Sequence, residues 1–193
     1  MSDSPTSHRI AEKARAILLN DGPEAVTMRR VAQAAGITAM ALYRHYPDRA
    51  GLLNALADAG FDDLTARLAQ VPPSGNAEKH LFRILDVYLD FAFEQPRLFE
   101  LMFLTRRPGA RRFPADFKSR QSPTANFAAA VIADGMKSGH FRRDDPWEIT
   151  FETGALLNGM VMLYFGERLN MQPDDFRAFC HRAFRRYIRG IRK

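Results

Sequence analysis

The sequence predicts an all-α protein of about nine helices, and two observations support this fold class. Apolar residues recur every three or four positions along most of the 193-residue chain, which is the period of an amphipathic helix. No segment alternates apolar and polar residues in the way that predicts a half-buried strand. The elements are therefore expected to be helices joined by turns and loops.

Capping and turn residues separate four helices in the N-terminal third. Residues 21–23, Asp-Gly-Pro, end the first helix. Thr27 and Thr38 are placed to cap the second and third helices, because a threonine oxygen can accept a hydrogen bond from a free N–H at a helix start. Gly36 separates these two helices, and Pro47 precedes the fourth. The expected helices cover about residues 7–19, 28–35, 39–46 and 49–70.

Proline and glycine also divide the rest of the chain. The segment 71–76 contains two prolines and a glycine and is the clearest break. Pro96 starts a new segment, Pro123 suits the first turn of a helix, and Gly139 ends that helix. Residues 105–121 are rich in Arg, Pro and Gly, so most of this segment is expected to be loop. The remaining helices are expected over about residues 77–94, 98–103, 123–138, 146–169 and 174–189.

Composition limits the class of protein without locating a site. The single cysteine, Cys180, excludes an internal disulfide and a cysteine-based metal cluster, and it fits a reducing compartment. The net charge of +6 favours an anionic partner such as nucleic acid, an anionic membrane or an acidic ligand. Residues 1–50 hold 7 Lys and Arg against 5 Asp and Glu, and residues 51–193 hold 21 against 17. Charge alone therefore does not single out either part of the chain.

Neither a signal peptide nor a membrane span is expected. The first residues are polar and lack the apolar core of a signal peptide. The most apolar stretch, residues 151–165, is interrupted by Glu152 and Asn158 and is shorter than the roughly 20 residues that a span needs. We expect a cytoplasmic protein, associated with the nucleoid and not with a membrane.

Residues 27–47 have the pattern of two short helices joined by a glycine turn, which is typical of a helix-turn-helix. Ala32 is small where the two helices must approach closely, and Gly36 can adopt the positive φ of a tight turn. Three apolar residues can fill the core between the helices: Val31, Ile37 and Leu42. With Leu42 facing inward, Ala39, Met40, Tyr43 and Arg44 can face outward. Small and apolar side chains can contact thymine methyl groups, and arginine can donate to guanine or phosphate.

These residues resemble the N-terminal domain of the tetracycline-repressor (TetR) family. The resemblance rests on residues 27–38, on Leu-Tyr-Arg-His-Tyr at 42–46 and on Leu-Leu at 52–53. Two positions depart from the family pattern: Tyr46 replaces the usual Phe, and Arg49 stands where Lys is common. Both changes preserve size or charge. The resemblance covers about residues 7–56 and implies a DNA-binding domain over residues 1–50 and a ligand-binding and dimerisation domain over residues 51–193.

The resemblance also assigns roles to individual residues of the motif. Phosphate contacts are implied for Thr27, Thr38, Tyr43, His45 and Arg49, and base-facing positions for Ala39, Met40 and Arg44. Arg29, within the same motif, completes the expected DNA-binding set. His45 has an alternative role in packing against the first helix, and Met40 can face the groove without reading a base.

In the TetR family the C-terminal domain dimerises through its last two helices and encloses a small-molecule pocket, so the resemblance implies both features here. The expected interface residues are Leu156, Met160, Leu163, Phe176, Phe179, Cys180, Ala183, Phe184 and Tyr187, with a monomer core as the alternative. The expected pocket residues are Leu85, Tyr88, Leu89, Phe103, Phe127, Val131, Phe151 and Asn158, with ordinary core packing as the alternative. These residues favour a largely apolar ligand, whereas the loop arginines Arg106, Arg107, Arg111 and Arg112 would favour an anionic one. The arginines of the last helix are interpreted as a solvated face.

The sequence therefore predicts a homodimeric transcriptional regulator, a repressor that a small molecule releases from a palindromic DNA operator. An architectural DNA-binding protein without a ligand is the first alternative. An enzyme with a site built from the C-terminal helices is the second, but the five histidines lie in separate segments and no catalytic motif is present. No catalytic residue, metal site or cofactor is expected.

Overall fold

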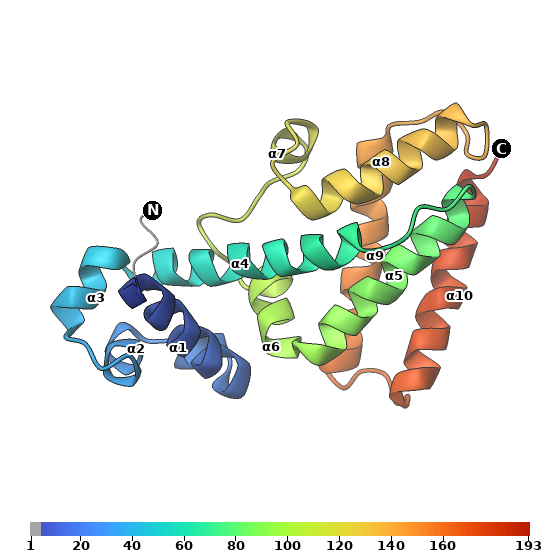
Figure 1. The fold of residues 1–193 in the computed structure, drawn as a ribbon. Coiled ribbons are helices and arrows are strands. Elements are labelled where there is room, and N and C mark those ends of the chain that lie inside the picture. The colour runs from blue at the N-terminus through green and yellow to red at the C-terminus, as the bar shows by residue number, and fades with distance from the viewer. Residues whose placement is uncertain (1–4) are drawn as a thin grey trace. The chain divides into compact units, whose positions relative to one another are not determined.

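The computed structural model describes residues 5–193, and helices form its whole framework (Figure 1). Ten α-helices are present: α1 Pro5–Asp21, α2 Met28–Ala34, α3 Ala39–His45, α4 Arg49–Ala69, α5 Ala77–Glu94, α6 Pro96–Phe99, α7 Ala115–Lys118, α8 Pro123–Lys137, α9 Pro146–Phe165 and α10 Pro173–Ile191. A 3-10 helix, η1 (Pro23–Ala25), and a π-helix, η2 (Glu100–Leu104), complete the order. Over residues 5–193 no strand forms, and one isolated bridge pairs Phe141 with Arg192. The predicted all-α class is confirmed.

Three elements differ from the sequence-based expectation. The segment expected to be mostly loop contains the one-turn helix α7. The expected helix over residues 98–103 starts earlier, at Pro96, and passes from α6 into the π-helix η2. The helix expected to reach residue 169 ends at Phe165, because Glu167 takes a positive φ of 56° that an α-helix cannot continue through.

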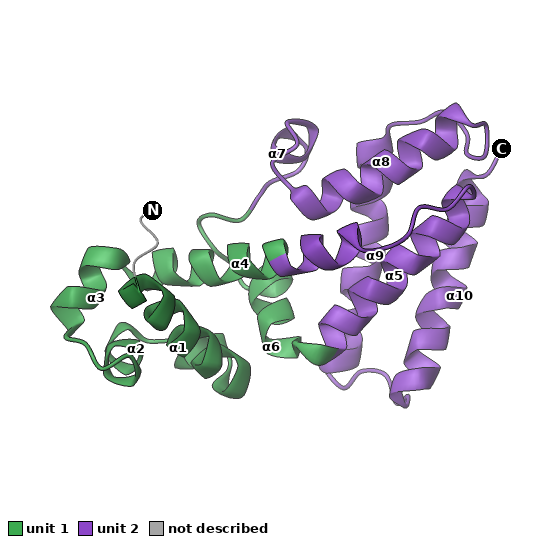
Figure 2. Ribbon diagram, in the orientation of Figure 1, with its two compact units in different colours: residues 1–62, 94–110 green, residues 63–93, 111–193 purple. Residues whose placement is uncertain are grey.

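The chain divides into two compact units, and α4 contributes residues to both (Figure 2). Unit 1 contains residues up to Asp62 together with residues 94–110. Unit 2 contains residues 63–93 and 111–193. Compactness thus divides the chain inside α4, whereas the domain boundary predicted from the sequence lies at residue 50.

A segment from the middle of the chain is built into unit 1 by close packing and a buried arginine. Gly60 of α4 leaves no room for a side chain, because a Cβ there would lie 2.6 Å from the Met102 sulfur. Arg107 is buried and donates to the carbonyl oxygens of Leu101 (3.0 Å) and Met102 (3.3 Å). It also donates to Oδ1 of Asn54 in α4 (3.0 Å). These contacts explain why residues 94–110 fold with the N-terminal helices.

Unit 2 is built around α5, α8, α9 and α10. Its core contains fully buried phenylalanines, among them Phe141 and Phe176. Phe141 occupies the space beside Gly135 of α8, where a Cβ would lie 2.4 Å from its ring. A polar seam joins α10 to α5, since His181 Nε2 lies 2.6 Å from Oδ1 of Asp86.

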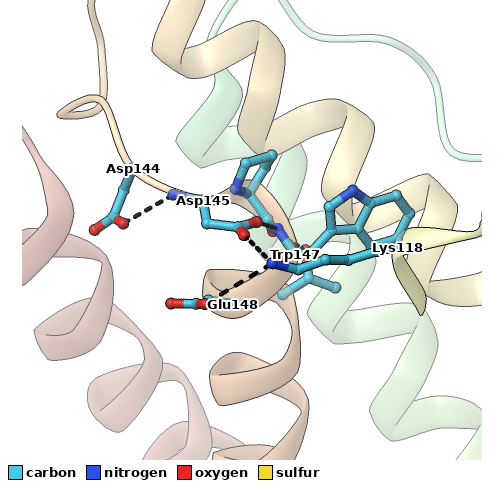
Figure 3. Close-up of polar contacts among 7 residues, drawn as sticks. Lys118, Asp144, Asp145, Trp147 and Glu148 are labelled. Atoms are coloured by element: carbon cyan, nitrogen blue, oxygen red, sulfur yellow. Dashed lines mark hydrogen bonds and ion pairs between the residues drawn. The ribbon is translucent and has the colours of Figure 1, made fainter. Parts of the chain in front are cut away.

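The start of α9 is held by carboxylates and by Lys118 from α7 (Figure 3). Asp145 caps the helix by accepting from the Trp147 N–H (2.8 Å), and it also binds the Lys118 ammonium (2.6 Å). Glu148 lies 4.0 Å from the same ammonium. The hydrogen bond from Lys118 lowers the pKa of Asp145, and the same bond raises the pKa of Lys118. The one-turn helix α7 is thus attached to α9 by a charged contact.

None of the helices described is both long and apolar enough to cross a lipid bilayer. Over the same residues, no three His, Cys, Asp or Glu side chains are grouped so that they could hold a metal ion.

Candidate nucleic-acid interface

The helix-turn-helix lies in unit 1 and is formed by α2, the turn at Gly36 and α3 (Figure 1). Thr27 caps α2, its hydroxyl oxygen accepting from the Arg30 N–H (3.3 Å). Thr38 caps α3 in the same way, accepting from the Ala41 N–H (3.2 Å). Gly36 has a φ of 65°, the left-handed conformation that favours glycine. The local signals of the sequence therefore place both helix starts and the turn correctly.

Apolar side chains hold the two short helices in place. Val31 of α2 and Leu42 of α3 are completely buried, and Ala32 is nearly so. Ile37, expected in this core, is only half-buried. Tyr46, at the end of α3, is buried, which agrees with the aromatic residue that the family pattern places there. The outward face of α3 is thereby fixed relative to α2.

The outward face of α3 carries residues that the sequence predicts to contact DNA. Met40 is 73% exposed, which is high for a large apolar side chain, and Tyr43 is 48% exposed. Ala39 and Arg44 are exposed beside them, and His45 is half-buried. Such a face, with a methionine, a phenol and a guanidinium in solvent, is suited to contact with a groove and its flanking phosphates.

The start of α2 adds further exposed donors. Arg29 is exposed, and so is the Thr27 cap. Arg30 is bound to Asp21 at the end of α1, so it connects α1 to α2. Arg29 is thus an exposed arginine of this turn, and its expected contact with DNA stays a prediction.

Arg49 has a structural role that sequence reasoning missed. Its Nε donates to the Val26 carbonyl (2.8 Å), and its Nη2 donates to the Pro23 carbonyl (2.7 Å). Nη2 also lies 3.3 Å from the Glu24 carboxylate. The guanidinium thus ties the start of α4 to η1 and the segment that leads into α2. Two of its three nitrogens therefore already donate within the chain. The phosphate contact expected for Arg49 stays a prediction.

Six of the eight expected pocket residues are apolar and lie in different parts of the chain. Leu85, Leu89 and Val131 are buried in unit 2, and Phe127 packs edge-on against the His80 ring at 6.0 Å. Phe103 belongs to unit 1, where it packs on Phe61 (5.3 Å) and Phe99 (4.7 Å). Phe151 is on the surface of α9, stacked with Phe113 at 4.4 Å.

The remaining two pocket residues, both half-buried, form a polar pair between α5 and α9. The Tyr88 hydroxyl donates to Oδ1 of Asn158. Burial raises the pKa of Tyr88 well above its ordinary value, so the phenol stays protonated and remains a donor. Tyr88 and Asn158 are thus the two polar members of the expected pocket set, and they contact each other directly.

The apolar stripe of α10 faces the interior of unit 2. Phe176, Cys180 and Phe184 are buried within one copy of the chain, and so is Met160 of α9. Burial also raises the pKa of the Cys180 thiol to about 11. A side chain covered in this way is not available to a second copy, so these four residues form a monomer core. Helical periodicity identified the apolar face but could not tell what covers it.

The other expected interface residues are more accessible. Leu163 of α9 is 44% exposed, and Leu156, Phe179, Ala183 and Tyr187 are half-buried. The Tyr187 hydroxyl donates to the Glu152 carboxylate (2.6 Å), which connects α10 to α9.

Two family models match the chain. The model described as the tetracyclin repressor-like C-terminal domain matches residues 81–187, which is more than half of the chain. The model described as bacterial regulatory proteins of the tetR family matches residues 10–56, the region that contains α2 and α3. The chain belongs to the TetR family. This TetR family member is a DNA-binding transcriptional regulator, and regulators of the family act as dimers and bind ligands.

Solved structures share the fold of this TetR regulator over nearly their whole length. A Rhodococcus sp. RHA1 protein of unknown function has a TM-score of 0.79 at 23% identity, covering 98% of this chain and 97% of the other. FadR from Bacillus subtilis, in complex with stearoyl-CoA, has a TM-score of 0.75 at 13% identity, covering 95% and 98%. PfmR from Thermus thermophilus, a TetR family regulator, has a TM-score of 0.63 at 21% identity, covering 90% and 95%. No curated protein matches the chain in sequence.

Replacing Arg49 tests its structural role. We expect Arg49→Ala to lower the free energy of unfolding by about 1.5–3 kcal/mol, because two carbonyl oxygens lose a charged donor. Arg49→Lys should restore only part of this, since one ammonium cannot reproduce the fork of a guanidinium. Urea unfolding measures both effects, with Arg44→Ala as the exposed control that stays within about 0.5 kcal/mol of the parent. An Arg49→Ala protein of unchanged stability and weakened DNA binding would show that Arg49 acts mainly on phosphate.

Proposed function

We propose that this regulator is a repressor that occupies a palindromic operator as a homodimer and is released by a small, largely apolar ligand. The observation that carries the proposal is the outward face of α3, where Met40, Tyr43 and Arg44 stand in solvent on a helix fixed by its caps. Two such helices in a dimer would enter successive major grooves about 34–36 Å apart. No catalytic activity is proposed.

The proposed DNA contacts divide into positioning and reading groups. The Thr27 and Thr38 hydroxyls accept cap bonds through oxygen and keep their own protons, which they can donate to phosphate. Tyr43 and Arg29 are further phosphate donors, and His45 is a weaker candidate because it is half-buried. Arg44 is the one long polar side chain on the groove face of α3, so it is the best candidate for a base contact.

Ala39 and Met40 would meet the bases at the start of α3. Neither side chain can form a strong hydrogen bond, so their contribution would be apolar contact with thymine methyl groups. Much of the affinity would then come from phosphates and from groove shape, and the operator would be read at few positions.

For the dimer, we propose that the second copy packs on the exposed apolar face of α9. Met162 is 50% exposed and Leu163 44%, and Ala155 is exposed on the same helix. At Gly154 and Gly159 no atom lies within 4 Å of where a Cβ would be, so another backbone can approach closely. This face replaces the buried stripe of α10 as the centre of the proposed interface.

For the ligand, we propose an apolar molecule with a polar group that meets Tyr88 and Asn158. These two residues are the polar pair among Leu85, Leu89 and their neighbours, which suits an apolar pocket with few polar anchors. Two of the loop arginines that would favour an anionic ligand already donate within the chain. Arg107 donates to backbone carbonyls, and Arg111 donates to the Gln121 carbonyl (2.6 Å). FadR from Bacillus subtilis, which shares the fold, binds stearoyl-CoA, a molecule with a long apolar chain.

The DNA contacts are tested on an operator selected from random duplexes. We expect Tyr43→Ala to weaken binding to all sequences alike, because a phosphate contact carries no sequence information. Arg44→Ala should reduce discrimination at one base pair by about 1–3 kcal/mol. Fluorescence anisotropy against single-mismatch duplexes measures both, and Lys79→Ala on α5 is the control. An unchanged operator affinity of Tyr43→Ala would exclude its phosphate role.

The dimer face is tested by placing charge on α9. We expect Leu163→Asp to give monomers, because an aspartate at an apolar interface is buried without a partner. In the monomer the same aspartate is exposed to solvent, so the helical content should be retained. Sedimentation velocity measures the change, with Arg168→Asp just beyond α9 as the control. A protein that stays dimeric with both Met162→Asp and Leu163→Asp would place the interface elsewhere.

The ligand site is tested by a thermal-shift screen with long-chain fatty acids and their CoA thioesters. A ligand at about 100 times its Kd stabilises the folded state by roughly 2.7 kcal/mol, which is a rise in Tm of roughly 5–10 °C for a chain of this size. Tyr88→Phe and Asn158→Leu should reduce that rise, whereas Tyr164→Phe should not. If stabilising compounds act equally on all four proteins, the polar pair is not the anchor.

A further inference from the structure

The C-terminal part of α10 carries a concentration of positive charge that the proposed function does not use. Residues 182–193 contain five arginines and one lysine and no acidic residue. Unit 2 as a whole holds 18 Lys and Arg against 13 Asp and Glu, whereas unit 1, with the helix-turn-helix, holds 10 against 9. The excess positive charge of the chain thus belongs mainly to unit 2.

Four of these arginines form one exposed surface, which we call the arginine stripe: Arg182, Arg185, Arg186 and Arg189. They lie on the side of α10 away from Phe184 and Ile188, which are buried in the core. At 1.5 Å per residue, the stripe extends about 10 Å along the helix. Its side chains therefore present a row of guanidinium groups to solvent.

The stripe is not neutralised within the chain. Other arginines of α10 are paired, Arg177 with Asp90 (2.6 Å) and Arg192 with Glu78. Over residues 5–193, no carboxylate lies within ion-pair distance of the four stripe arginines. The structure therefore leaves four adjacent positive charges without an anionic partner.

Aromatic rings hold two of the stripe arginines in place. The Arg182 guanidinium lies over the Phe179 ring at 5.9 Å, and the Arg185 guanidinium lies over the Phe82 ring at 5.5 Å. A ring beneath a guanidinium restricts its motion but leaves its N–H groups free to donate. Less side-chain entropy is then lost when an anion binds.

We propose that the arginine stripe binds the phosphate backbone of duplex DNA, without sequence preference, as a second DNA surface in addition to α3. Arginine donates in a fork that matches the oxygens of a phosphate. A protein partner is less suitable, because protein interfaces have an apolar centre, whereas the exposed residues over positions 182–189 are all arginines. Each protomer would then contact DNA twice, through α3 at an operator and through α10 at any sequence.

The test separates this surface from the helix-turn-helix. The parent is the full chain with Tyr43→Ala and Arg44→Ala, which weakens the α3 contact, and the probe is a short duplex of arbitrary sequence. The stripe variant adds Arg182→Gln, Arg185→Gln and Arg189→Gln. The control variant adds Lys79→Gln, Arg120→Gln and Arg168→Gln, which remove the same charge from other exposed positions of unit 2.

The measurement is the slope of log Kobs against log salt concentration, by fluorescence anisotropy. Each phosphate contact contributes about 0.9 to this slope, so the stripe variant should be shallower than its parent by about 2.7, and the control should match the parent. Circular dichroism melting checks that all three proteins are folded. Equal slopes for parent and stripe variant, or an equal change in the control, would overturn the proposal.

Discussion

The helix-turn-helix depends on apolar burial, because neither of its helices is long enough to be stable alone. α2 and α3 have seven residues each, and isolated helices shorter than about 12 residues are marginal in water. Burial of Val31 and Leu42 contributes about 1.5–3 kcal/mol each, whereas a threonine cap contributes about 1 kcal/mol. The caps thus set where the helices start, and the core of unit 1 provides most of the energy that keeps them folded.

That core also includes residues 94–110, which follow directly in the chain on α5, the helix that carries the proposed ligand contact. Tyr88 lies on α5, and α5 leads through Gln95 into α6 and η2. Gln95 accepts a hydrogen bond from Arg15 of α1, and Arg107 binds Asn54 of α4. A ligand that shifts α5 would therefore act, through the covalent chain, on a segment packed against the helices that position α3. Two conformations of this segment with different ligand affinity would be sufficient to couple the sites.

Sequence reasoning succeeded where the signal is local. The Thr27 and Thr38 caps and the turn at Gly36 depend on residues within a few positions of one another, so their types predict their structure. It failed where distant segments decide the outcome. The Arg49 bonds to η1 carbonyls and the short helix α7, attached through Lys118 to Asp145, both depend on tertiary contacts. The apolar residues Phe176, Cys180 and Phe184 of α10 were predicted to lie at an interface and are buried in the core, because helical periodicity cannot distinguish a core face from an interface face.

Charge was the least informative signal, and the structure explains why. Unit 1 has nearly balanced charge, so its net charge does not indicate that it contains the helix-turn-helix. The proposed DNA contacts depend instead on a small number of placed donors, such as the Thr38 hydroxyl, Tyr43 and Arg44. The excess charge lies in unit 2, where four exposed arginines of α10 (Arg182, Arg185, Arg186 and Arg189) have no carboxylate within ion-pair distance among residues 5–193. The net charge of the whole chain therefore shows neither the placement of individual donors on α3 nor the density of positive charge on α10.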